Sequence, residues 1–120
     1  MQLTRYSTGE LNEFRLLVES KLDDTLRQYN AAIWQLQALG GSETSSAHDA
    51  DFAMREALYV KAARLKRNVD NLRSARLRIE NKTYGVCIVT GTLIPRQRLL
   101  AVPHTTINTE ARVNAMRLGA

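Results

Sequence analysis

Apolar residues recur at steps of three and four along two long stretches of this 120-residue chain, and this spacing limits the fold more than any other feature. It places an apolar side chain on one side of every helical turn, so each stretch predicts an amphipathic helix. The first series is Leu11, Phe14, Val18, Leu22, Leu26, Tyr29, Ile33 and Leu36. The second is Leu58, Ala62, Leu65, Val69, Leu72, Ala75 and Ile79. Since each stripe needs a cover, the two predict a hairpin of antiparallel helices packed as a coiled coil.

The ends of these two helices carry signals of their own. Ser7-Thr8-Gly9-Glu10 fits a capping box, in which the serine hydroxyl and the glutamate carboxylate each bind a backbone N–H that the first helical turn leaves unpaired. Gly40-Gly41 favours a turn, the small polar residues that follow suit a loop, and Asp49 offers an N-cap for the second helix. We therefore predict a helical hairpin over residues 1–82, with its tip at about 40–50.

The pattern changes after Lys82. The next residues are rich in β-formers, and Gly91 and Pro95 mark turns, which predicts a compact base with one or two short strands. Thr105 or Thr106 can cap a last helix, so residues 83–120 are expected to form the base and a C-terminal helix. A dense apolar set is expected to hold this base together: Tyr84, Val86, Cys87, Ile88, Val89, Leu93, Ile94, Leu99, Leu100 and Val102.

Composition indicates the cellular compartment in which the protein is expected to act. The single cysteine excludes an internal disulfide. The first residues lack the apolar core of a secretory signal, and no apolar run approaches the ~18 residues of a membrane span. We therefore expect a cytoplasmic protein without a membrane partner.

The net charge of +5 is unevenly distributed. Residues 61–82 hold eight Lys or Arg against two Asp or Glu, whereas residues 1–60 hold five against nine. A basic helix can neutralise nucleic-acid phosphates, but charge also keeps a helix solvated. The eight basic residues are Lys61, Arg64, Lys66, Arg67, Arg73, Arg76, Arg78 and Lys82. They do not keep to one helical face and no aromatic platform is interleaved, so we expect no direct sequence-specific DNA binding.

The segment that joins the second helix to the base carries a family pattern. It reads Arg78-Ile79-Glu80-Asn81-Lys82-Thr83-Tyr84-Gly85-Val86-Cys87, followed by Thr90-Gly91, Ile94, Arg98-Leu99, Ala101 and Pro103. In order and spacing, these residues resemble the DksA/TraR family of bacterial transcription regulators. The resemblance implies a mainly α fold, with a long antiparallel coiled-coil helical hairpin, a small zinc-ribbon-like globular base and a C-terminal helix.

The resemblance also implies a function. Family members bind RNA polymerase and insert the coiled-coil tip into its secondary channel, where acidic residues modulate initiation. The candidates for such tip acids are Asp49 and Asp51, with Glu43 further back in the loop. A structural interpretation stands beside this one, with Asp49 as N-cap and Asp51 as a first-turn acid favoured by the helix dipole. The two interpretations are compatible, because a capping carboxylate can remain exposed.

The zinc motif of the family is degenerate here. A structural zinc site needs four sulfur or nitrogen ligands, and only Cys87 occupies such a position, with Thr90, Asn108 and Ala111 at the others. His104 could join Cys87, but two ligands do not close a structural site. We therefore expect no bound zinc and no other cofactor, and a Cys87 that serves as a small buried hydrophobic residue.

Some family members respond to the alarmone guanosine tetraphosphate through basic residues of the base. Val102 stands at a position that is arginine in those members, while Arg98 and Arg112 remain nearby as basic contacts. Phosphate binding favours fixed arginine donors. The substitution at Val102 therefore argues against alarmone binding in the same manner.

Other classes of function fit the sequence less well. An enzyme is not expected, because there is no phosphate loop or supported Ser/His/Asp set, and only His48 and His104 titrate near neutrality. A basic-helix nucleic-acid-binding protein is one alternative. A coiled-coil adaptor is another, with Trp34 and Tyr59 as partner anchors. We expect these two aromatic residues to cover the helical seam instead.

Overall fold

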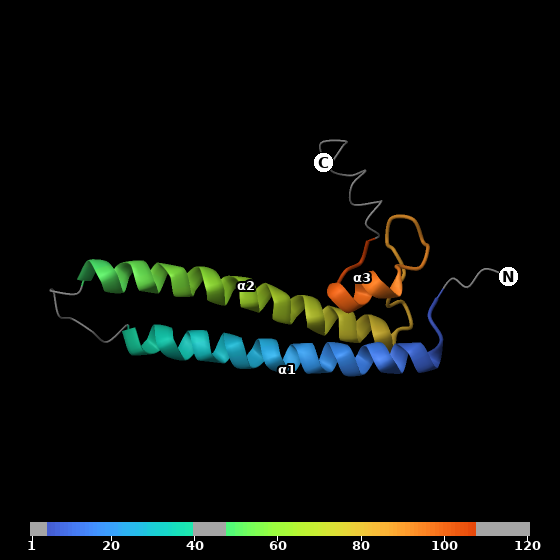
Figure 1. Ribbon diagram of the computed structural model, residues 1–120, viewed down its shortest axis with the longest axis horizontal. Helices are drawn as coiled ribbons and strands as arrows, with labels where there is room; N and C mark the ends of the chain where they lie inside the picture. The colour runs from blue at the N-terminus through green and yellow to red at the C-terminus, as the bar shows by residue number, and fades with distance from the viewer. Residues whose placement is uncertain (1–4, 40–47, 108–120) are drawn as a thin grey trace. The chain divides into compact units, whose positions relative to one another are not determined.

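The computed structural model describes residues 5–39 and 48–107 of the chain (Figure 1). Its elements are α1 (Thr8–Leu39), α2 (His48–Glu80) and α3 (Arg96–Ala101). The chain divides into two compact units, of which unit 1 holds residues 1–21 and 71–120, and unit 2 holds residues 22–70. Each unit therefore takes one segment of α1 and one segment of α2.

The capping box predicted at the start of α1 is present. The backbone N–H of Glu10 donates to the Ser7 hydroxyl at 3.2 Å, and the backbone N–H of Ser7 donates to the Glu10 carboxylate at 3.3 Å. The two bonds satisfy donors that the first helical turn leaves without partners. This local pairing explains why α1 begins at Thr8.

In unit 1 the predicted apolar stripes supply the helical core. Leu11, Phe14 and Val18 of α1 are buried, as are Leu72, Ala75 and Ile79 of α2. Three residues on each side, spaced by three and four, give each segment one continuous apolar face. The prediction that these positions face the core is confirmed.

In unit 2 the stripes meet again. Ala32 of α1 forms a buried cluster with Ala62 and Leu65 of α2, and the larger residues Tyr29, Ile33 and Leu36 pack against it. Further along, Leu39 of α1 contacts Arg55 of α2. Residue numbers thus rise along α1 as they fall along α2, so the segments of this unit run antiparallel, as Figure 1 shows.

An aromatic cluster extends the unit 1 core. The ring centroid of Phe14 lies 5.2 Å from that of Tyr6 and 5.2 Å from that of Tyr84, with the Tyr6 ring edge-on. The Tyr6 hydroxyl also donates a hydrogen bond to the carbonyl of Ile94. These contacts tie the chain before α1 and the segment after α2 to the same core.

The sequence after α2 forms turns and one short helix in place of the predicted strands. Between residues 81 and 107 the only pairing of strand type is a single antiparallel bridge between Val86 and Leu93, so the predicted strands are absent from the described part of the chain. Gly91 takes a positive φ of 72° and its N–H donates to the Cys87 carbonyl at 2.8 Å, which reverses the chain before a ladder can extend. The sequence did not indicate α3, because six residues are too short to show a helical period.

The apolar set predicted for the base divides into buried, exposed and partly buried members, the last being Val86, Leu93 and Val102. Tyr84, Cys87, Ile94 and Leu99 are fully buried, which confirms the prediction that Cys87 behaves as a small hydrophobic residue. The prediction was wrong for the three exposed members, which are Ile88, Val89 and Leu100. Ile88 and Val89 follow Cys87 at the outer part of the turn, where only the cysteine side chain points inward.

The two compact units are divided at other positions than residue 82, and the division into a hairpin and a base at that residue stays a prediction. The first turns of α1 and the last turns of α2 belong to the same unit as residues 83–107. Phe14 of α1 packs against Tyr84, so the base shares its aromatic core with the helix ends. The predicted C-terminal helix lies outside the described residues, as do Asn108, Ala111 and Arg112.

Candidate functional site

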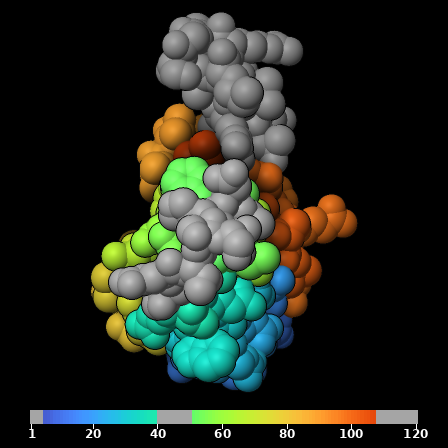
Figure 2. Space-filling model, turned by 90° about the vertical axis from the view of Figure 1, so that its left-hand side faces the viewer, coloured from blue at the N-terminus to red at the C-terminus, as the bar shows by residue number. Residues whose placement is uncertain are grey.

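Two places in the fold concentrate the features predicted to carry function: the part of unit 2 where α1 ends and α2 begins, and a hollow in unit 1. The first is viewed end-on in Figure 2, in which the last turns of α1 (cyan) and the first turns of α2 (green) lie side by side. The helices here flank residues 40–47, which lie outside the described part, as does Glu43 among the predicted tip acids.

The structure changes the interpretation of the other two acids. Helix α2 begins at His48, so Asp49 lies inside the first turn and the prediction that it is the N-cap was wrong. Asp51 is partly buried, whereas the three residues after it are exposed.

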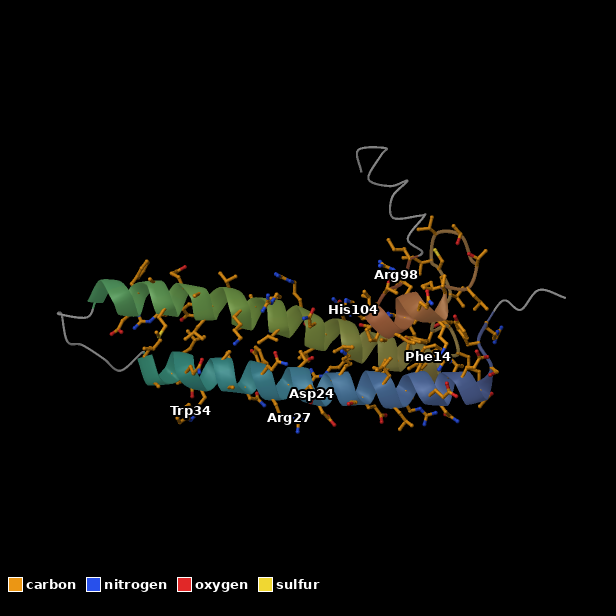
Figure 3. The ribbon with its side chains drawn as sticks, viewed as in Figure 1. Phe14, Asp24, Arg27, Trp34, Arg98 and His104 are labelled. Atoms are coloured by element: carbon orange, nitrogen blue, oxygen red, sulfur yellow. The ribbon has the colours of Figure 1, made fainter. Side chains whose placement is uncertain are left out.

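Exposed apolar side chains surround this part of unit 2. Trp34 is 72% exposed, so the expectation that it covers the seam was wrong. It follows Ile33 by one position and therefore lies off the apolar stripe, and Figure 3 shows it projecting from α1. Tyr59 is also exposed. A hollow of about 420 Å³ opens beside Trp34, and it is lined by Trp34, Gln35, Ala38, Leu39, Met54 and Leu58.

The hollow in unit 1 is polar. It measures about 360 Å³ and is lined by Asn71, Ser74, Arg78, Arg98, Val102, His104, Thr105, Thr106 and Ile107. Arg78 of α2 donates to the backbone carbonyl of His104 at 3.2 Å, which holds its guanidinium against the hollow wall. Arg98 of α3 adds a second guanidinium, and Figure 3 shows this residue near His104. The Nε atom of Arg98 is buried and has no acceptor among the described residues.

Burial and like charge set the electrostatics of this hollow. Burial lowers the pKa of Arg78 from its ordinary value, yet the guanidinium remains charged at neutral pH. Burial and then the nearby Arg78 charge lower the pKa of His104, so its imidazole is neutral at pH 7. Two cations and threonine hydroxyls make the hollow suited to a small anion rather than to a cation.

Of the basic contacts predicted from the resemblance, Arg98 and Arg112, only Arg98 lies within the described residues, and it lines this hollow. Val102 lines it as well, in the position predicted to weaken alarmone binding. Sequence reasoning missed Arg78, because nothing distinguished it within the basic run of residues 61–82. Its role depends on a turn that brings His104 back to α2.

Two of the four degenerate zinc positions, Cys87 and Thr90, lie in a hydrogen-bonded turn. The backbone N–H of Thr90 donates to the Cys87 sulfur at 3.5 Å, and the Cys87 N–H donates to the Thr92 carbonyl at 2.8 Å. Across the stretches 5–39 and 48–107, no three His, Cys, Asp or Glu side chains gather into a possible metal site. Zinc-free folding of the whole chain remains a prediction.

Helix length and hydropathy bear on membranes. Searching the described residues, no helix combines the length and apolar character that a bilayer span requires. Both long helices instead include several charged residues.

The fold is mainly helical. In each unit a segment of α1 packs against an antiparallel segment of α2, and residues 81–107 complete the core of unit 1. The same fold occurs in the solved structure of transcription factor DksA2 from Pseudomonas aeruginosa, which matches with a TM-score of 0.88. The match covers 92% of this chain and 86% of that chain at 22% sequence identity. The chain therefore has a DksA-like fold. No protein-family model matches it, and no curated protein matches it in sequence.

Proposed function

We propose that this protein is a DksA-like transcription regulator that binds bacterial RNA polymerase and inserts the end of unit 2 into the secondary channel. The single observation that carries the proposal is the match in fold to the transcription factor DksA2 over 92% of this chain. The family pattern from Arg78 to Pro103 supports it from the sequence side.

Charge at the end of unit 2 supports the same proposal. Between Arg27 and Arg55 the sequence contains no lysine or arginine, and its three acids are Glu43, Asp49 and Asp51. A segment with only acidic charge is attracted to the positive potential of a site that binds metal ions and nucleic-acid phosphates. The tip acids are therefore the residues proposed to act on the polymerase.

We further propose that the protein acts in the cytoplasm, without zinc or another cofactor and without catalysis of its own. Its regulation by the alarmone differs from that of family members with arginine at the position of Val102. In this proposal the hollow between Arg78 and Arg98 is not needed for polymerase binding.

Co-elution with purified polymerase tests the proposal. The protein is expected to elute with core or holoenzyme and to be displaced by another secondary-channel factor. A double variant, Asp49→Ala with Asp51→Ala, is expected to bind polymerase but to lose its effect on initiation. Asp23→Ala is the matched control, because Asp23 is an exposed acid of the same unit, whereas Asp24 pairs with Arg27 at 2.5 Å (Figure 3). Failure to bind core or holoenzyme would reject the proposal.

A helical adaptor is the second candidate, and one observation favours it. Exposed Trp34 beside an apolar hollow fits a partner anchor, since tryptophan is enriched at binding hot spots. One variant distinguishes the two candidate functions. A regulator that acts through its tip acids tolerates Trp34→Ala, whereas an adaptor anchored by Trp34 loses its partner.

A basic-helix nucleic-acid-binding protein gains no support from the structure. Arg78 bonds to His104 inside unit 1 and is not presented to solvent as one of a row of phosphate contacts.

A further inference from the structure

The end of α1 lacks a charge that long helices commonly carry. The last four carbonyls of a helix have no partner within it, and together they hold a partial negative charge. A basic side chain in the last turn usually offsets this charge, but α1 has none there. Another donor, either a side chain or water, then satisfies these carbonyls.

Arg55 of α2 supplies such a group within unit 2. Its Nη2 atom donates to the carbonyl oxygen of Leu39 at 3.1 Å, across 16 residues of sequence. A guanidinium carries several donors in a fixed plane, so it can meet more than one carbonyl at a helix end. The Nε of Arg55 is also buried, and none of the described residues provides its acceptor.

Arg55 also lies on the same face of α2 as Asp51. The two residues are four positions apart, which places them one above the other along the helix. Both are partly buried, whereas Phe52, Ala53 and Met54 between them are exposed. The covered face of the first turns of α2 is therefore the face that carries Asp51 and Arg55.

From this geometry we propose that Arg55 is a positioning residue that binds the carbonyl end of α1 and thereby fixes the first turns of α2, with Asp51, in one orientation. The consequence for transcription rests on the proposed function. The clamp between Arg55 and Leu39 does not, because it is a property of the protein alone.

Hydrogen exchange of the full-length protein tests the clamp. Arg55→Met keeps an apolar stem of similar length but removes the charge and all donors. Exchange of the backbone amides in residues 36–39 and 52–55 is expected to rise roughly tenfold, which corresponds to the loss of one charge-assisted hydrogen bond. Amides around Ala62 and Leu65 should keep their protection. Arg64→Met is the matched control, since Arg64 is an exposed arginine of the same helix and unit.

A lysine variant distinguishes a positioning role from simple packing. Arg55→Lys retains a charged donor near the carbonyls, so it is expected to restore most of the protection that Arg55→Met loses. Unchanged exchange in Arg55→Met, an equal rise in Arg64→Met, or a lysine variant as unprotected as the methionine variant would each overturn the assignment.

The functional consequence is read in a separate assay. With polymerase, Arg55→Met is expected to bind within about twofold of the wild-type affinity while its maximal effect on initiation falls about tenfold, if one orientation of Asp51 is required. An unchanged maximal effect would overturn the link to Asp51. If the wild-type protein does not bind polymerase, the proposed function fails, but the exchange comparison still decides whether Arg55 holds the helix end.

Discussion

The hydroxyl of Tyr84 donates a hydrogen bond of 2.8 Å to the carbonyl oxygen of Pro103, inside the core of unit 1. Tyr84 comes directly before the turn that starts at Gly85, and Pro103 follows α3, so the bond closes the segment between them. Both residues are buried. Water cannot replace this bond if the hydroxyl is lost, because neither partner reaches solvent.

Tyr84→Phe is therefore expected to lower the free energy of unfolding by about 1–3 kcal/mol, since the Pro103 carbonyl is left without a partner. Urea unfolding followed by circular dichroism measures the change. Tyr59→Phe serves as the control, because Tyr59 is exposed and its hydroxyl can bond to water. Equal stability of Tyr84→Phe and the wild type would show that the bond contributes nothing.

The same residue predicts a pH dependence. Burial raises the pKa of Tyr84 to about 12 from an ordinary value of 10.0, against a smaller opposing effect of Arg78. Because the folded pKa is the higher one, its contribution to stability is complete below pH 10 and is lost as the pH rises towards 12. The free energy of unfolding should fall by roughly 2 kcal/mol over this range, and Tyr84→Phe should remove most of the fall. A wild-type profile that stays flat up to pH 12 would contradict this.

Two glycines of unit 1 give a matched comparison. Gly85 has a φ of +79°, and an added Cβ would lie 2.6 Å from the Tyr6 ring, whereas Gly91 has a φ of +72° with open space around it. Gly91→Ala is expected to cost about 1–2 kcal/mol from backbone strain alone. Gly85→Ala adds overpacking of an aromatic core, for a total of about 2–5 kcal/mol. Equal losses in thermal or urea unfolding would show that the Tyr6 ring moves aside freely.

The turn around Cys87 predicts the result of metal removal. The purified protein is expected to contain less than stoichiometric zinc, and its unfolding temperature should not change with EDTA, because hydrogen bonds hold this turn. Cys87→Ala is expected to cost about 1–2 kcal/mol as a lost buried side chain, with no change in metal content. Atomic absorption after dialysis is the measurement. One zinc per chain would show that ligands beyond the described residues complete a site.

Trp34 and Leu65 contrast an exposed with a buried apolar residue of unit 2. Trp34→Ala should change the free energy of unfolding by less than about 0.5 kcal/mol, as is usual for surface sites. Leu65→Ala should cost about 2–5 kcal/mol, because it empties a position in the core cluster. A large loss in Trp34→Ala would indicate that the indole covers the seam after all.

The helices could be predicted because their signals are local. The spacing of Leu11, Phe14 and Val18 reports a period of 3.6 residues, and the capping box lies within four residues, so neither depends on the rest of the fold. Cys87 could be predicted as buried from its chemistry and its apolar neighbours. With Asp49 as the predicted N-cap, α2 was expected to begin at residue 50, whereas it begins two positions earlier at His48, in keeping with the weak local signal of a helix end.

The remaining features depend on residues that are distant in sequence. The hollow of unit 1 forms because Arg78 and His104, 26 positions apart, are joined by a hydrogen bond. Ile88 is exposed because the direction of the turn is set by Gly91 and by the bond to the Cys87 sulfur. The role of Arg55 depends on the opposite helix ending at Leu39. The spacing of residue types along the sequence does not indicate which of these distant residues come into contact.

The hydrogen bond from the Tyr6 hydroxyl to the Ile94 carbonyl has a consequence for the order of events during synthesis. Unit 2 is one continuous stretch of chain, so its contacts can form as soon as residue 70 has left the ribosome. Unit 1 joins the first 21 residues to those after 70, so its aromatic core cannot form until Tyr84 has emerged, and the bond to Ile94 forms later still. The Tyr6 hydroxyl therefore gains its partner only 88 residues later in the sequence, so unit 1 can close only after the contacts of unit 2 have become possible.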